Sequence, residues 1–103
     1  MTFSELNLPP VLIAALPSHI EQPTDIQQLA IPIALAQQDV LALSQTGSGK
    51  TLAFGLPILQ SILQNKANNP AAVQGLIIVP TRELAVQVSE SLQTIGQAVG
   101  IDV

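Results

Sequence analysis

Hydrophobic and polar positions follow two different patterns along the chain. In four segments, residues 9–22, 24–35, 50–64 and 81–99, apolar side chains recur every three or four positions, which predicts amphipathic helices. Residues 39–43 (apolar after Asp39) and 76–79 are short continuous apolar runs, which are typical of parallel strands buried on both faces, and residues 101–103 could begin a third strand. This order predicts an α/β fold with a parallel sheet and helices on both faces.

Prolines and hydroxyl residues set the expected helix ends. Pro17 should end the first helix and Thr24 should cap the second, because a threonine oxygen accepts hydrogen bonds from the first turn. Pro32 should break or kink the second helix near residue 30 or 31. Pro57 should kink the third helix by leaving the carbonyl of Ala53 unpaired.

The apolar stripes also identify a candidate core. The expected inner faces are Ile26, Leu29, Ala30, Ile33 and Leu35 in the second helix, Leu52, Leu56, Leu59 and Leu63 in the third, and Leu84, Val88, Leu92 and Ile95 in the fourth. Thr81 should cap the fourth helix, and Gly96 and Gly100 lie near its end. Residues 65–74 combine asparagine, proline and small residues without a period, which predicts a loop.

The composition is that of one small folded domain. The chain has 103 residues, of which 48% are hydrophobic and 10% charged, so one core is possible but not two. With no cysteine and a single histidine, disulfides and cysteine or histidine metal sites are excluded. No apolar run is long enough to cross a membrane, and the first residues do not resemble a signal peptide. We therefore expect an intracellular, cytoplasmic protein without a membrane partner.

The charge balance limits how the chain could bind nucleic acid. The net charge is −4, and the basic residues are Lys50, Lys66 and Arg82. Binding through a broad basic face is excluded, because that mode needs many lysines and arginines. Any contact with nucleic acid must come from a few placed groups.

The stretch SQTGSGKT, residues 44–51, predicts a phosphate site. It matches the pattern GxxxxGK[ST] at Gly49, Lys50 and Thr51, although Ser44 stands where the first glycine is usual. A predicted strand precedes it and a predicted helix follows, so backbone N–H groups would converge where an anion is favoured. The lysine would reach the terminal phosphates and the Thr51 hydroxyl would bind Mg²⁺. The alternative is a glycine-rich turn with an incidental lysine.

Two further stretches, PTDIQ at 23–27 and PTREL at 80–84, are each ordinary helix starts when taken alone. Together with the glycine loop, however, they resemble the N-terminal part of the DEAD-box RNA helicase family. Phe3 resembles the isolated upstream aromatic of that family, EQPTDIQ its Q motif, SQTGSGKT its motif I and VPTRELAVQ its motif Ia. The resemblance covers nearly the whole chain.

The resemblance implies ATP and Mg²⁺ as cofactors. Gln27 would hydrogen-bond the adenine edge, and Phe3 would pack on the adenine face. Lys50 and Thr51 would be the catalytic residues, with Thr51 on the metal. The implied nucleotide-binding set is Phe3, Gln27, Thr46, Gly47, Ser48, Gly49, Lys50 and Thr51.

The resemblance also implies RNA as partner. Pro80, Thr81 and Arg82 would contact the sugar–phosphate backbone of one RNA strand, with little sequence specificity. Glu83 would orient this motif rather than act in catalysis. Two of the three basic residues would then serve a site, which accounts for the low positive charge.

The family's later motifs are missing from these 103 residues. The resemblance divides the chain into a Q-motif helical region, 1–38, and the first half of a RecA-like domain, 39–103. Without the DEAD tetrapeptide, the SAT motif, motif VI and the second RecA-like domain, we expect a fragment that does not hydrolyse ATP alone. Two alternatives stay open: a short nucleotide- or RNA-binding protein without turnover, and another P-loop ATPase.

Overall fold

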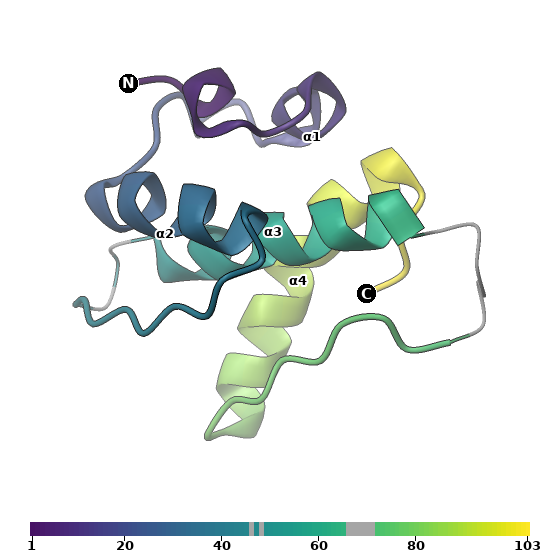
Figure 1. The fold of residues 1–103 in the computed structure, drawn as a ribbon. Helices are drawn as coiled ribbons and strands as arrows, with labels where there is room; N and C mark the ends of the chain where they lie inside the picture. The colour runs from purple at the N-terminus through teal and green to yellow at the C-terminus, as the bar shows by residue number, and fades with distance from the viewer. Residues whose placement is uncertain (46, 48, 66–71) are drawn as a thin grey trace.

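The computed structural model describes residues 1–45, 47, 49–65 and 72–103. Its helices are η1 (Phe3–Leu6, a 3₁₀-helix), α1 (Pro10–Ala15), α2 (Asp25–Leu35), α3 (Lys50–Asn65) and α4 (Arg82–Val99) (Figure 1). The four predicted helices are confirmed, and η1 is an addition. No helix of the described residues is both long and apolar enough to cross a membrane.

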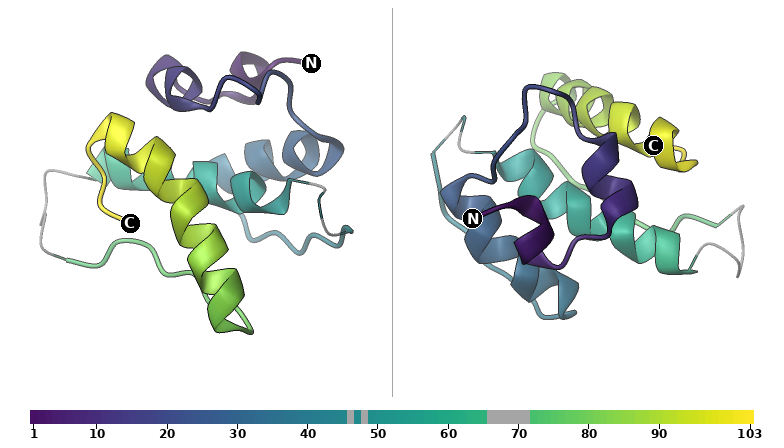
Figure 2. Two further views of the ribbon diagram at one scale, coloured as in Figure 1. Left: turned by 180° about the vertical axis from the view of Figure 1, so that it is seen from behind. Right: turned by 90° about the horizontal axis from the view of Figure 1, so that it is seen from above.

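The helices are stacked in layers. Helices η1 and α1 lie together on one side of α2 and α3, which run next to each other, as the view from above shows (Figure 2). Helix α4 contacts α1 and α3, and its N-terminal end projects away from the other helices (Figures 1 and 2). The start of α4 is therefore the most isolated helix end in the described part of the chain.

Every helix contributes to one hydrophobic core. Its buried members are Phe3, Leu6, Leu8, Leu12, Ile31, Leu56, Leu59, Leu92, Ile95 and Ile101. The crossing of α3 and α4 is close, because a Cβ built on Gly55 would overlap the side chain of Leu92. Within this core η1 contacts α2, and α1 contacts η1 and α4.

The structure corrects part of the predicted core. In α2 the buried residues are Gln27, Ala30 and Ile31, whereas Leu29 is 69% exposed and Ile33 41%. The prediction followed the apolar residues alone, and of its set Ala30 is buried, but the covered face also carries the polar Gln27 and Ile31. In α4, Leu92 and Ile95 are buried as expected, whereas Leu84 is 40% exposed because the first turns extend beyond the core.

The prolines do not end the helices that contain them. Helix α2 continues past Pro32 to Leu35, so the helix does not break there, and α3 continues past Pro57; the kinks expected at the two prolines stay predictions. Helix α3 reaches Asn65, the first residue of the predicted loop, and residues 72–74 of that loop are non-helical. Residues 66–71 lie outside the described part of the chain.

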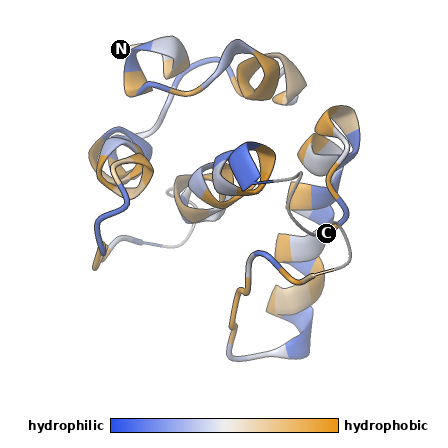
Figure 3. Cartoon of the chain, turned by 45° about the vertical axis from the view of Figure 1, so that its right-hand side comes forward, coloured by the Kyte–Doolittle hydropathy of each residue, from blue (hydrophilic) through white to orange (hydrophobic). Residues whose placement is uncertain are grey.

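The predicted strands at 39–43, 76–79 and 101–103 do not form: among the described residues none is in a strand. A parallel strand needs a hydrogen-bonded neighbour, and here the two apolar runs do not pair with each other. Leu41 is 90% exposed and Ile78 85%, and the run before α4 appears as an orange tube on the outside of the cartoon (Figure 3). The sheet of the predicted α/β fold is thus not formed within these residues.

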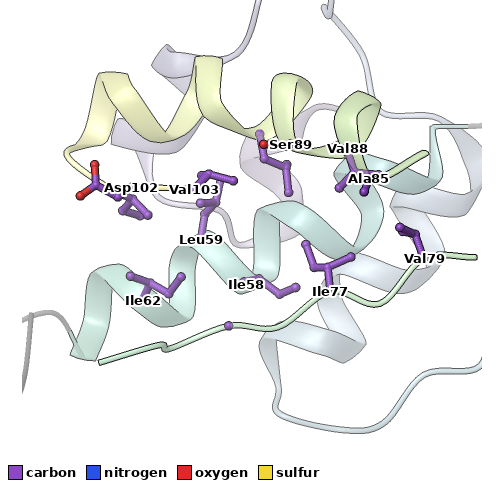
Figure 4. A pocket seen from close by; sticks show the side chains of 13 residues that line it. Ile58, Leu59, Ile62, Ile77, Val79, Ala85, Val88, Ser89, Asp102 and Val103 are labelled. Atoms are coloured by element: carbon purple, nitrogen blue, oxygen red, sulfur yellow. The ribbon is translucent and has the colours of Figure 1, made fainter. Parts of the chain in front are cut away.

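An apolar pocket of about 260 Å³ lies between α3, the 75–79 segment, α4 and residues 101–103 (Figure 4). Ile58 and Ile62 of α3 line one wall, and Ile77 and Val79 line another. The lining is mostly aliphatic. This pocket is a second sign that the surface beside the predicted strands is apolar.

Candidate nucleotide and RNA sites

The start of α2 is closed by a reciprocal pair of hydrogen bonds. The backbone N–H of Gln27 donates to Thr24 Oγ1 at 3.4 Å, and the backbone N–H of Thr24 donates to Gln27 Oε1 at 2.9 Å. This arrangement is a capping box, which satisfies two N–H groups that the helix itself leaves unpaired. The side chain of Gln27 is therefore held at the helix start and is only 2% exposed.

The other end of the same carboxamide reaches the glycine loop. Gln27 Nε2 donates to the carbonyl oxygen of Gly49 at 3.1 Å, across 22 positions of sequence. A Cβ built on Gly49 would lie 2.5 Å from this nitrogen and 2.9 Å from Thr24 Oγ1, so only glycine fits here without a shift. The predicted Q motif and the predicted phosphate loop are thus joined directly.

The loop has the backbone conformation that its glycines permit. Gly47 has a φ of +84° and Gly49 a φ of +91°, values that residues with a Cβ rarely adopt. Helix α3 begins directly afterwards, with Lys50 exposed and Thr51 half-buried in its first turn. The predicted loop residues Thr46 and Ser48 lie outside the described part of the chain.

Phe3 lies in the hydrophobic core. Its side chain is 3% exposed and belongs to the same buried cluster as Leu6, Leu12 and Ile31. Its position in η1 is fixed by a second capping box, in which Thr2 and Glu5 are the partners. Packing of Phe3 on an adenine face stays a prediction, and in this structure the ring supports the core beside α2.

The predicted RNA-binding residues lie at the start of α4. Thr81 is the N-cap, and its Oγ1 accepts a hydrogen bond from the backbone N–H of Leu84 at 3.2 Å. Pro80, Thr81 and Arg82 are all exposed, as is Glu83 in the first turn. An exposed, capped helix start with one arginine can accept a phosphate group.

The two candidate sites are separate. The glycine loop precedes α3 at one side of the molecule, whereas the start of α4 projects from another part in every view (Figures 1 and 2). The described residues contain no cluster of three or more histidine, cysteine or acidic side chains that could hold a metal ion.

One contact at this site was not predicted: the hydrogen bond from the backbone N–H of Thr24 to Gln27 Oε1. The signal was present in the sequence, because T-D-I-Q at 24–27 matches the capping-box pattern of Ser or Thr followed three residues later by Glu or Gln. Thr24 was assigned only as a cap for its hydroxyl group.

Comparison with known proteins gives a consistent family. The family model described as "DEAD/DEAH box helicase" matches residues 24–103. ATP-dependent RNA helicase dbp9 of Aspergillus terreus is 52% identical over 106 residues, which cover 100% of this chain and 17% of that protein. The dbp9 protein of Aspergillus niger is 53% identical over 104 residues, covering 98% of this chain and 17% of that protein.

Solved structures agree. The RNA helicase Prp28 from Chaetomium thermophilum bound to ADP superposes with a TM-score of 0.89 at 37% identity, covering 99% of this chain and 25% of that chain. The yeast DEAD-box splicing factor Prp28 gives a TM-score of 0.81 at 33% identity, covering 96% of this chain and 25% of that chain. The chain thus has the backbone of the corresponding part of these helicases and spans 17% of the length of the curated relatives it matches. The four motifs, the fold and these similarities together show that the chain belongs to the DEAD/DEAH box helicase family.

Proposed function

We propose that this chain provides the ATP site and part of the RNA-binding surface of an ATP-dependent RNA helicase. The observation that carries the proposal is the hydrogen bond from Gln27 Nε2 to the Gly49 carbonyl. It places a side chain suited to reading a base next to a loop suited to holding phosphates. The solved relative bound to ADP and the relatives named as ATP-dependent RNA helicases support this assignment.

The Gln27 carboxamide keeps the hydrogen-bonding capacity that an adenine needs. A carboxamide has two N–H donors and two acceptor lone pairs. Here one donor is used by the Gly49 carbonyl and one lone pair by the N–H of Thr24. One donor and one acceptor remain, which match the N7 acceptor and N6 amino donor of adenine. The proposed base contact would use this donor and acceptor, and it requires the carboxamide, which is 2% exposed in this structure, to become accessible to the base.

The loop and the start of α3 would hold the phosphates. The two left-handed glycines, Gly47 and Gly49, bring the backbone close to a ligand, and the N–H groups at the start of α3 favour an anion. The exposed Lys50 can reach the terminal phosphates, and the Thr51 hydroxyl is the group that would bind Mg²⁺. The metal would neutralise phosphate charge as the terminal phosphate is transferred to water.

The start of α4 would hold the backbone of one RNA strand. Thr81 already stabilises the helix start through its bond to the Leu84 N–H, so the first N–H groups are presented in a fixed direction. The guanidinium of the exposed Arg82 can form paired hydrogen bonds with a phosphate. Contacts of this kind position RNA without reading its bases.

Substitution of the loop lysine tests the proposal. In the longer protein that we expect to contain this segment, Lys50→Ala should abolish ATP-driven unwinding and weaken ATP binding at least about tenfold, since a charge-assisted bond is worth about 1.5–3 kcal/mol. ATP binding and strand separation are measured on the purified protein. Lys66→Ala is the matched control, because it removes the same charge outside the four motifs. Unwinding that survives Lys50→Ala would refute the phosphate assignment.

A further inference from the structure

A polar pocket lies toward the C-terminal ends of α2 and α3, whereas the glycine loop lies at the start of α3. Its volume is about 270 Å³, and it is formed by the last turns of α2, the second half of α3 and the residue that follows η1. The described polar side chains that line it are Asn7, Gln37, Gln60, Ser61 and Gln64. None of these side chains forms a hydrogen bond with another described residue. Their donors and acceptors are therefore available to a ligand.

Gln37 has a backbone conformation that glycine adopts more easily. Its φ is +65°, in the left-handed region, directly after the C-cap Ala36 of α2. Glycine is the commonest residue at this position of a helix end, because a Cβ is disfavoured there. Asn7 has a φ of +71°, so both non-glycine residues with a left-handed backbone in the described chain line this one pocket. Backbone strain gathers at functional sites, which indicates that the Gln37 side chain serves a purpose other than stability.

The chemistry of the lining restricts the ligand. The described lining residues include no lysine or arginine to pair with a phosphate, and no acidic side chain or histidine to bind a metal ion. They also include no aromatic ring on which a nucleobase could stack. Their polar groups are carboxamides and one hydroxyl group, and each carboxamide offers both donors and acceptors. This set matches the alternating N–H and C=O groups of an extended peptide.

We propose that this pocket binds a short, extended and uncharged peptide segment of a partner protein, with Gln37 as its main specificity-determining residue. The volume lies just below the range of about 300–1,000 Å³ that is usual for ligand pockets, so a few residues fit rather than a folded domain. The pocket shares no residue with the proposed nucleotide site or the proposed RNA site. A partner bound here leaves both of those sites accessible.

Photocrosslinking tests the proposal in the longer protein that we expect to contain this segment. The probe is a blocked tetrapeptide of two glutamines, one serine and a photoreactive leucine analogue. Mass spectrometry should locate saturable crosslinks in residues 32–37 and 57–64. The same peptide with glutamates in place of the glutamines should label these residues at least about fivefold less, because carboxylates lack the N–H donors. Crosslinks that do not saturate or that fall elsewhere would overturn the proposal, as would a pocket covered by a later segment of the same chain.

Gln37→Gly separates peptide binding from stability. Glycine relieves the left-handed backbone, so Tm should rise by about 2–4 °C, whereas peptide crosslinking should fall about fivefold with the loss of one carboxamide. Gln38→Ala is the matched control, because Gln38 is exposed and does not line the pocket. That variant should keep crosslinking within about twofold of the parent, and both variants should keep the parent's ATP affinity. Crosslinking of Gln37→Gly that equals the parent's would overturn the proposal.

Discussion

Two helices of this protein begin with the same dipeptide and the same cap, yet their starts differ. Helix α2 follows Pro23 and Thr24, and α4 follows Pro80 and Thr81; each threonine oxygen accepts from the N–H three residues on. At α2 that third residue is Gln27, which returns a bond to the N-cap N–H. At α4 the third residue is Leu84, whose side chain has no polar atom that could bond the N–H of Thr81.

The difference teaches how one local motif can serve two purposes. The α2 start is closed by its own side chain, so its glutamine becomes a fixed, buried amide beside the glycine loop. At the α4 start only the N–H of Leu84 is capped by a side chain, and the residues there are exposed, so an external phosphate can reach them. The proposed base recognition uses the first arrangement, and the proposed binding of an RNA backbone uses the second.

Substitution of Gln27 at the start of α2 should have the largest effect, on nucleotide preference. Gln27→Ala deletes both internal bonds of the carboxamide and its remaining donor and acceptor. We expect the preference for ATP over GTP to fall at least about tenfold, since two hydrogen bonds of about 1 kcal/mol each are lost. Competition between the two nucleotides in the longer protein measures this ratio, with RNA affinity in the absence of nucleotide as the control. Unchanged preference would contradict the role of Gln27.

Substitution of Arg82 should weaken RNA binding at the start of α4. Arg82→Ala should weaken binding of single-stranded RNA about fivefold to tenfold, because a charge-assisted bond to phosphate is lost. The slope of log affinity against log salt should become shallower by about 0.7, as expected for one phosphate of a single strand. Arg82→Lys, which keeps the charge, should keep that slope. A full salt slope in Arg82→Ala would show that this side chain does not meet a phosphate.

Leu84→Gln would give the start of α4 the same reciprocal capping as the start of α2, and its expected effect is the smallest. Leu84→Gln puts a carboxamide at the position that Gln27 has in α2, so it can reach back to the N–H of Thr81. We expect a gain of about 0.5 kcal/mol, or about 2–4 °C in Tm, together with about twofold weaker RNA binding.

The matched control is Leu84→Ala, which removes the same exposed apolar side chain without adding an amide. RNA affinity and thermal unfolding are measured for both variants. If Leu84→Gln and Leu84→Ala bind RNA equally, the openness of the α4 start does not matter for the RNA site.

The helices and the two site motifs were predictable from the sequence because their signals are local. Thr24, Thr81 and Gly100 mark helix ends through hydrogen bonds or a left-handed turn within a few residues. The buried face of α2 was not predictable from apolar spacing, because the buried position 27 is a glutamine whose partner lies 22 residues away. Burial of Phe3 was missed for the same reason: its partners in the core come from other helices.

The predicted strands show what local composition cannot predict. The apolar runs 39–43 and 76–79 have the composition of buried strands, yet a strand exists only with a neighbour to pair with. The apolar pattern therefore indicated that these residues favour a strand conformation. Whether a strand forms depends on neighbouring strands with which it can pair. The similarity to the Prp28 structures settles the family and fold at a level that local pattern could not.

The exposed apolar runs have a consequence for the timing of folding. The helices pack on one another although the described residues form no paired strands, and the contacts within each helix are close in sequence and form fast. Pairing of parallel strands is slower because it closes long loops. During that interval Leu41, Leu43, Leu76 and Ile78 face water and invite contact with other chains. In the longer protein that we expect to contain this segment, the state before strand pairing would be the one most exposed to aggregation.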